Sequence, residues 1–556
     1  MKFQIKEKKK AKIILAIGVM LIITPIIIWK VFAHSETSVF MEKEMSYGTK
    51  NLSERSVKID SCLINGENGE VKVKVSADII PESDDEYYYL FALNPYEEEI
   101  EEDAVFLSKE QKDRKAEFGL EADIFLKFVV AVKRDGRYIA VSSPHYITNP
   151  EEVSIFKYNG EKPSSKKGLL IDPDKLMSPE LDDLGIKHAA YNIPVSRILE
   201  CSGDDIYPDI HYIYHGKDYI FNGRVMAEYD FIFRTLTEKG IEITAIILND
   251  YSEEYPWMIH PLSRSGIGKP PYYAFNASDE KGAEYLAAIG SFLVGRYSGA
   301  MNGRGVVANW VISNEINARK EWNYMKHVDL ELYVREYARA YRIFYNAIRS
   351  VNSACGVYIS LDNQWNRINI LTQSYKAKDV LDEFNRQIKE EGNIEWGLAI
   401  HPYNKPLSRP FTWKSSIYVK NTEKTPVVTM ANIHVVTDYM QKEEFLTEEG
   451  EVRSIILSEL GYTSSKGEEV QAAAIVYAYK VAEANPYIDS ILFSRQTDAE
   501  EEIERLHLYL GIDHGDGSHK YAYDVYKYMD TDKAEEYTKF AKEIIGIGDW
   551  GEIINR

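Results

Sequence analysis

Two glutamates stand out because each closes a short apolar run of the sequence. Glu315 ends the run at residues 309–315, and Glu459 ends the run at residues 455–459. Such runs are typical of buried parallel strands, which are apolar on both faces and become polar where they leave the sheet. Two carboxyl groups on neighbouring strand ends can protonate a leaving oxygen and attack an anomeric carbon, which is the chemistry of glycoside cleavage. Glu315 and Glu459 are therefore candidate catalytic residues.

The elements that must position them begin after residue 167, where apolar runs alternate with amphipathic segments in the manner of parallel α/β domains. Eight strands are predicted, at residues 168–171, 186–193, 243–248, 306–313, 356–361, 396–401, 454–458 and 490–494. Amphipathic helices are predicted at residues 229–239, 280–297, 330–351, 377–390, 469–484 and 522–529. Eight β/α units predict a (β/α)8 TIM barrel. A doubly wound sheet, the alternative, would usually carry a glycine-rich loop after its first strand, and residues 168–173 have none.

The predicted strand ends carry an unusual variety of polar side chains. In a (β/α)8 barrel the carboxyl ends of all strands open on one face, which holds the active site. The strand ends contribute Asn192, Asn249, Asp250, Asn314, Glu315, Asp362, Asn363, His401, Tyr403, Asn404, Glu459, Arg495 and Gln496. A rim kept only for solubility would favour lysine and glutamate, so this mixture indicates a site for a polar ligand.

Three of these strand-end motifs resemble those of clan A glycoside hydrolases, the retaining (β/α)8-barrel group that includes cellulases, mannanases and xylanases. They are Asn-Glu after the fourth strand, His-x-Tyr after the sixth and Glu after the seventh. The resemblance implies that Glu315 is the acid/base and Glu459 the nucleophile. It further implies that Asn314 binds the hydroxyl next to the anomeric carbon, and that His401 and Tyr403 hold the nucleophile and the sugar.

The resemblance covers about residues 168–532 and is to an uncharacterised bacterial branch of the clan. Common members often carry an arginine early in the barrel, where this chain has Asn192, and many end the eighth strand with tryptophan, where it has Arg495. Asn192 and Arg495 remain candidate substrate contacts. Among the many loop aromatics we expect Trp322, which lies in the loop after the fourth strand, to contact a sugar.

The N-terminal part of the chain predicts export. Six lysines precede an apolar run at residues 13–29, whose length lies between that of a signal-peptide core and that of a membrane span. Residues 1–34 are therefore predicted to be a signal peptide or signal anchor, and residues 35–55 a tether. The basic flank would stay in the cytoplasm, so the remainder is expected outside the cell, attached to the membrane if the segment is not cleaved.

A small all-β domain is predicted between the tether and the barrel. Residues 56–150 contain alternating strands such as residues 71–75 and a hairpin turn at Gly136, a pattern typical of a β-sandwich. The Pro/Ser/Lys-rich residues 151–167 read as a linker to the barrel at residues 168–556. We expect the sandwich to fold by itself and the barrel to remain soluble without it.

Charge and cysteine content narrow the class of partner. The net charge of −21 argues against nucleic acid and suits an exported protein with a neutral or cationic ligand. Cys62, Cys201 and Cys355 are far apart in sequence and predict three isolated buried thiols rather than disulfides or a zinc site. A metal-dependent hydrolase would need a His/Asp cluster, and only His260 and His514 lie in loops that could approach His401.

The sequence thus predicts an extracellular retaining glycoside hydrolase that acts on a polysaccharide or oligosaccharide without cofactor or metal. The alternative is a non-catalytic carbohydrate-binding surface protein on the same barrel. Both would keep the aromatic loop residues, but only the enzyme requires both Glu315 and Glu459.

Overall fold

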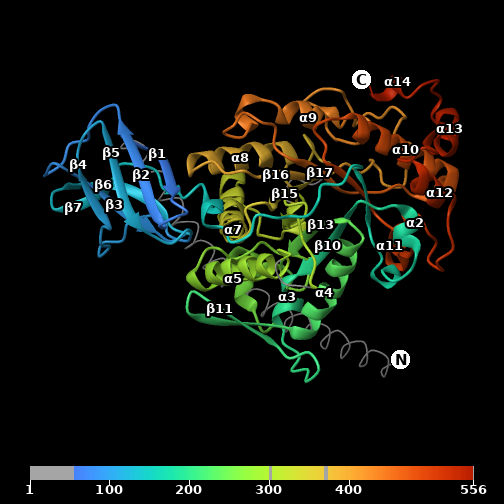
Figure 1. The fold of residues 1–556 in the computed structure, drawn as a ribbon. Coiled ribbons are helices and arrows are strands. Elements are labelled where there is room, and N and C mark those ends of the chain that lie inside the picture. Colours follow the sequence, from blue (N-terminus) through green and yellow to red (C-terminus); the bar gives the residue numbers. More distant parts are fainter. Residues whose placement is uncertain (1–54, 300–302, 369–372, 555–556) are drawn as a thin grey trace, which may run out of the picture.

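The computed structural model describes residues 55–299, 303–368 and 373–554 and contains a closed parallel barrel beside a smaller all-β part (Figure 1). The barrel strands are β9 (Lys167–Leu170), β10 (His188–Pro194), β13 (Glu242–Leu248), β14 (Asn309–Ile312), β15 (Gly356–Asp362), β16 (Gly397–His401), β17 (Ile455–Leu460) and β18 (Ser490–Phe493). Strand β18 pairs with β9 and closes the ring. The eight predicted strands are confirmed, with ends shifted by a few residues.

The six predicted helices of the barrel are also present. They are α4 (Gly223–Glu238), α5 (Glu280–Arg296), α7 (Leu330–Val351), α8 (Ala377–Glu390), α10 (Glu468–Ala484) and α12 (Tyr521–Tyr528). Helix α4 begins earlier than predicted, because the Asn222 side chain accepts a hydrogen bond from the backbone N–H of Val225 and caps the helix there. Asp279 and Asp329 cap α5 and α7 in the same way.

Shorter elements in the connections were not predicted. They are α2 (Glu180–Leu184), α3 (Val195–Leu199), the hairpin β11 (Ile210–Tyr214) and β12 (Lys217–Phe221), α6 (Arg319–Trp322), α9 (His434–Met440), α11 (Glu500–Leu506), α13 (Ala534–Ile545) and α14 (Gly551–Ile554). Most are too short for hydrophobic periodicity to be read. They lengthen the loops around the barrel.

Side chains fill the interior of the barrel. The inward-facing cluster is Ala190, Ile246, Leu248, Val311, Tyr358, Ala399, Ile456 and Leu492, all buried. The outward faces of the strands pack against the helices in a separate, larger core. The barrel is therefore a closed scaffold, and polar residues at its carboxyl end form the available site.

The all-β part is a sandwich of two antiparallel sheets, as predicted. One sheet contains β1 (Val57–Ile64), β2 (Glu70–Ala77) and β5 (Lys115–Glu121). The other contains β3 (Tyr87–Leu93), β4 (Ser108–Gln111), β6 (Lys127–Arg134), β7 (Arg137–Ala140) and β8 (His145–Tyr146). A hydrophobic core of its own lies between the sheets. Asp135 and Gly136 both have positive φ (49° and 76°), which is the conformation of the expected tight hairpin turn.

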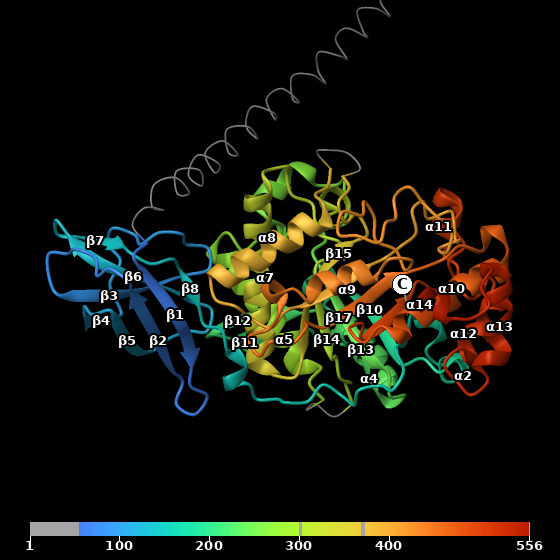
Figure 2. The same cartoon turned by 90° about the horizontal axis from the view of Figure 1, so that it is seen from above.

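The sandwich packs against helix α7 of the barrel (Figures 1 and 2). Arg339 of α7 forms an ion pair with Glu98, and the Asn346 amide donates to the Ile124 carbonyl at 2.7 Å. The guanidinium of buried Arg342 lies 5.0 Å from the centroid of the Tyr146 ring. This interface was not predicted, because polar residues on a helix usually indicate its solvent-facing side.

The connection between the two parts is also fixed to the barrel. Phe156 N–H donates to the Val351 carbonyl at 3.0 Å, and the Asn352 amide donates to the Tyr158 carbonyl at 2.7 Å. Lys167 already belongs to β9, where it is buried and paired with Asp530. Residues 151–167 therefore lie along the barrel instead of forming a free linker.

We expect the interface to contribute to stability. Arg339→Ala would remove the cation that pairs with the buried carboxylate of Glu336 and the partly buried carboxylate of Glu98, at a cost of about 3 kcal/mol, and should lower Tm by about 5 °C. The shortened chain 168–556 should melt lower still. Differential scanning calorimetry would measure both changes. Arg505→Ala, which breaks an exposed ion pair with Glu501, is the control and should melt like the wild type. A shortened chain with unchanged Tm would show that the interface adds nothing.

Two sequence predictions have other outcomes. Cys62 and Cys355 are buried, but Cys201 is exposed, so the prediction of three buried thiols is wrong for this residue, which lies in the loop after α3. In the described part of the chain, no helix has both the length and the apolar content needed to cross a membrane. The predicted signal segment at residues 1–34 lies outside the described residues.

Candidate active site

The turn after β14 holds Glu315 in a strained backbone conformation. Ser313 and Glu315 have φ values of 64° and 37°, which non-glycine residues rarely adopt. Strand β15 stabilises this turn: the Glu315 N–H donates to Ser360 Oγ at 3.0 Å, and the Ile316 N–H donates to the Ser360 carbonyl at 3.0 Å. Backbone strain of this kind is retained where the rest of the structure enforces it, and it concentrates at functional sites. Asn314 lies between the two strained residues and is partly exposed.

His401, at the end of β16, contacts Glu315. Its Nδ1 lies 2.8 Å from Glu315 Oε1, and its Nε2 lies 3.0 Å from the hydroxyl of Ser458 on β17. Burial lowers the pKa of His401, but the hydrogen bond to Glu315 and the charges of Glu459, Glu315 and Asp362 outweigh it and raise the pKa. The resemblance implied that His401 would hold the nucleophile or the sugar. In the structure His401 is hydrogen-bonded to Glu315 and not to Glu459, the residue that the resemblance implied to be the nucleophile.

Glu459 lies within β17 at an irregularity of the strand. Leu457 pairs with Ile491 and Leu460 with Phe493, so β17 contains one extra residue there, and such bulges re-aim side chains. The hydroxyl of Tyr403 donates to Glu459 Oε1 at 2.7 Å, as the resemblance implied. Burial, followed by the charge of Glu459, raises the pKa of Tyr403 far above its usual value, so the phenol remains a donor.

Asp362, at the end of β15, is a further carboxyl group of this cluster. Its Oδ1 accepts hydrogen bonds from the Asn317 amide at 2.5 Å and from the Gln364 N–H at 2.7 Å. Burial and the negative charge of Glu315 raise the pKa of Asp362 to about 7. Its place at a strand end was visible in the sequence, but an Asp-Asn pair belongs to none of the motifs that pointed to the other residues.

Asn192 and Arg495 line a pocket of about 420 Å³ between the ends of β9, β10 and β18. Arg495 Nη2 donates to Glu502 Oε1 at 2.9 Å. Within the described residues, Arg495 Nε and Thr497 Oγ1 are buried with no hydrogen-bond partner. Burial raises the pKa of Glu502, the partner of Arg495; the charge of Arg495 opposes this shift and the charge of Glu459 adds to it.

Trp322 is the last residue of α6, in the same loop as Glu315. Its ring stacks on that of Tyr272, with a centroid separation of 6.0 Å and an interplanar angle of 27°. Both side chains are partly exposed. The pair therefore offers an aromatic surface at the loop that carries Glu315.

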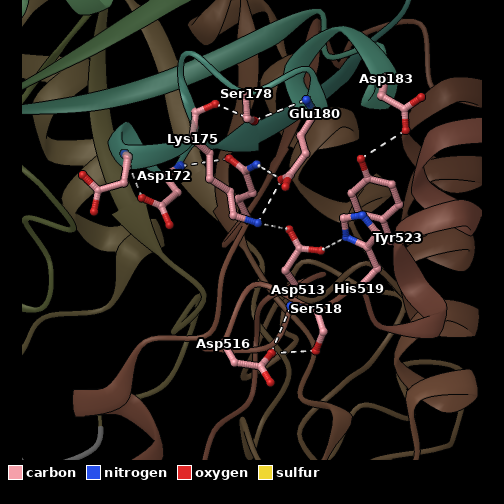
Figure 3. Close-up of polar contacts among 12 residues, drawn as sticks. Asp172, Lys175, Ser178, Glu180, Asp183, Asp513, Asp516, Ser518, His519 and Tyr523 are labelled. Carbon is pink, nitrogen blue, oxygen red and sulfur yellow. Dashed lines mark hydrogen bonds and ion pairs between the residues drawn. The ribbon is translucent and has the colours of Figure 1, made fainter.

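A separate charged cluster lies between α2 and the loop after β18 (Figure 3). Glu180, Asp513 and His519 have possible metal-binding atoms within 4.8 Å of one another. The ammonium of Lys175 already lies 2.9 Å from Glu180 and 2.7 Å from buried Asp513. Figure 3 draws both contacts as dashed lines. Lys175 thus supplies the positive charge that these carboxylates need, and the cluster joins the first and last β/α units.

The two other histidines considered for a metal site have different partners. His260 pairs with Glu336 in the core at 3.1 Å, and His514 pairs with Glu468 at 3.1 Å. His401 is the histidine that joins the two-glutamate cluster, through Glu315. The cluster is thus built of three carboxyl groups, one imidazole and one phenol.

The fold and this cluster define a (β/α)8-barrel protein with two glutamates at the carboxyl ends of its strands. The chain belongs to the family of unknown function DUF5722, whose model matches residues 159–553. No curated protein matches it.

Several solved structures similar to the chain are glycoside hydrolases. A family 39 glycoside hydrolase from the gut symbiont Bacteroides cellulosilyticus WH2 has 14% identity and a TM-score of 0.45, over 85% of this chain and 81% of that one. A hyperthermophilic β-glucosidase has 12% identity and a TM-score of 0.40, over 62% of this chain and 84% of that one. The β-glucuronidase of Bacteroides uniformis has 11% identity and a TM-score of 0.39, over 85% of this chain and only 51% of that one. These values are too low to transfer a substrate or a residue role.

Proposed function

We propose that this protein is a retaining glycoside hydrolase that acts on an oligosaccharide or polysaccharide, with Glu315 as the acid/base and Glu459 as the nucleophile. One observation carries the proposal. The two glutamates lie at the ends of β14 and β17, and each is hydrogen-bonded to a residue at the end of β16 or just beyond it, Glu315 to His401 and Glu459 to Tyr403. Paired carboxyl groups in different hydrogen-bonding environments are what the double-displacement mechanism requires.

In the first step Glu459 attacks the anomeric carbon while Glu315 gives its proton to the leaving oxygen. The bond from carbon to the leaving oxygen breaks, and an ester to Glu459 forms. In the second step Glu315 takes a proton from water, whose oxygen displaces Glu459. The two inversions together retain the configuration. Because Tyr403 occupies Oε1 of Glu459, the Oε2 atom is free to attack.

His401 supplies a second place for the proton of Glu315. The hydrogen bond between Nδ1 and Oε1 can hold a proton on either atom, and Ser458 can donate to Nε2 or accept from it. The proton moves to Glu315 for donation and returns when Glu315 must act as a base. The charges that raise the pKa of His401 favour the second of these transfers, in which the imidazole takes up the proton.

The surroundings of the two glutamates suggest how a sugar chain would lie. Arg495, Thr497 and Asn192 line a polar pocket at the ends of β9, β10 and β18, and we assign this pocket to the sugar that forms the ester. Trp322 and Tyr272 lie on the side of Glu315, which suits the leaving part, since aromatic faces stack on the C–H surfaces of sugars.

The proposed activity is tested with purified residues 34–556, a panel of aryl glycosides and a panel of polysaccharides. Hydrolysis of at least one substrate, with retention at the anomeric carbon by proton NMR, is the expected result. Binding to a polysaccharide without hydrolysis would favour the alternative of a carbohydrate-binding protein. If no member of either panel is bound or hydrolysed, the proposal of a carbohydrate substrate is contradicted.

We also propose that the chain is exported and acts outside the cell. The support is the sequence of residues 1–34, in which six lysines precede an apolar run. Fractionation of the native host is expected to find the protein in the medium or on the outer side of the membrane. The intact chain dissolved in the cytoplasm would contradict the proposal.

A further inference from the structure

A second cavity, of about 250 Å³, lies outside the barrel mouth, where the sandwich meets the barrel. Its walls come from the loop after β3, the loop between β5 and β6, the hairpin β11–β12, and helices α5 and α7. Figure 2 shows the hairpin on the side of the barrel that faces the sandwich, and His215 in its turn lies 3.1 Å from Asp123 of the sandwich. Parts of the chain that are far apart in sequence therefore enclose one cavity, and ligand sites occur preferentially at such junctions.

Aromatic rings form much of the cavity wall. They are Tyr96 and Phe125 from the sandwich and Tyr214, His215 and Tyr219 from the hairpin. The rings of Tyr214 and His215 stack with centroids 4.3 Å apart, and the ring of Phe125 lies 6.1 Å from that of His215. The apolar remainder of the wall is formed by Leu126, Ala283, Ala287 and Ile343. Walls of this kind suit the C–H faces of a sugar ring.

Two phenols of the cavity wall have no hydrogen-bond partner among the described residues. Tyr219 is only 5% exposed, and a tyrosine buried to this extent usually finds a partner for its hydroxyl. Tyr96 is partly buried and likewise unpartnered. Burial and neighbouring carboxylates raise the pKa of both phenols to about 12, so each remains a donor. The wall therefore holds two unused hydrogen-bond donors.

The charged groups of the wall are mainly acidic. Asp123 is paired with His215, and Glu284 is paired with Lys217. Glu280, in the first turn of α5, has no ion-pair partner among the described residues. Because both basic side chains are paired and one carboxylate remains, the cavity disfavours an acidic ligand. The carboxylates can instead accept hydrogen bonds from hydroxyl groups.

We propose that this cavity is a second carbohydrate site, which binds one unit of an oligosaccharide or polysaccharide that carries no acidic groups. The aromatic wall packs against the sugar ring, Tyr96 and Tyr219 donate to its oxygen atoms, and Glu280 accepts from a hydroxyl group. The volume is just below the range of about 300–1,000 Å³ of drug-sized ligand sites, which suits a single ring. The site uses neither Glu315 nor Glu459, and it gives the sandwich a part in binding.

The test is isothermal titration calorimetry of the full chain, with Glu459→Gln in every protein so that no probe is hydrolysed. The neutral probes are the β-1,4-linked hexasaccharides of glucose, mannose, xylose and galactose, and hexagalacturonate is the acidic probe. At least one neutral probe should bind. Tyr219→Phe should weaken this binding about five-fold, the effect of one lost hydrogen bond, and Tyr96→Ala should weaken it about ten-fold or more, because it also removes a ring.

Tyr87→Phe and Tyr87→Ala are the matched controls. Tyr87 is an exposed tyrosine at the other end of β3 from the cavity, and both variants should bind the probes with unchanged affinity. Tyr219→Phe removes a single oxygen atom, so its result does not depend on a variant that fails to fold.

Three results would overturn the proposal: no neutral probe binds, both cavity variants keep the unchanged affinity, or the cavity variants lose binding of hexagalacturonate. These titrations do not depend on catalysis. If wild type hydrolyses no glycoside, the proposed function fails, whereas the cavity site stands or falls with the affinities alone.

Discussion

Glu459→Ala is expected to lower kcat by about ten-thousand-fold or more on every substrate, because neither displacement can occur without the nucleophile. The loss should not depend on the leaving group, since the variant lacks the attacking atom itself. Azide should restore turnover from the opposite face of the sugar and give a glycosyl azide of inverted configuration. Steady-state kinetics and NMR of the product would measure both results.

The matched control for this variant is Glu469→Ala, which removes a glutamate from the first turn of α10. It should keep the wild-type kcat. Tyr403→Phe should show a smaller loss than Glu459→Ala, because it removes one hydrogen bond to Glu459 and leaves the carboxylate in place. A Glu459→Ala enzyme with near-normal turnover would contradict the assignment of the nucleophile.

Glu315→Ala should have the second-largest effect, and its size should depend on the substrate. Glycosides with poor leaving groups should lose about a thousand-fold or more in kcat/KM, because their oxygen must be protonated as it departs. Dinitrophenyl glycosides should still react in the first step, and the glycosyl-enzyme should then accumulate because no base activates water. Azide should release it as a glycosyl azide of retained configuration.

Rapid-quench kinetics would detect this accumulation as a burst of phenol followed by slow turnover. Glu321→Ala is the matched control, because Glu321 lies in the same loop and interacts with Glu315 only through its charge. It should keep most of the wild-type rate and show no burst. A Glu315→Ala loss that is equal for good and poor leaving groups would contradict the acid role.

The barrel and its main residues could be predicted because they depend on local patterns. Apolar runs ending in Asn314-Glu315 and Glu459 mark strand ends in the sequence itself, and strand order then assigns them to one face. Helix α7 was predicted with its observed ends from its wide apolar face, and the structure adds the Asp329 cap.

The rest depends on contacts between residues far apart in the chain. The sequence alone could not show whether His401 contacts Glu315 or Glu459. Strand β16, which carries His401, lies between β14 and β17 in the order of the barrel strands. The hydrogen bond between Asp362 and Asn317 joins residues 45 positions apart, and burial raises the pKa of Asp362. The pocket at Arg495 and the sandwich interface at Arg339 likewise require three-dimensional placement.

The identity of the residue that becomes esterified tests the central claim most directly. Glu315→Ala would be incubated with a dinitrophenyl glycoside of the sugar found active in the panel, quenched in acid and analysed by intact mass and peptide mapping. We predict a mass increase of one glycosyl unit, located on Glu459. A glycosyl group on another residue, or an active wild-type enzyme that inverts the anomeric configuration, would contradict the account.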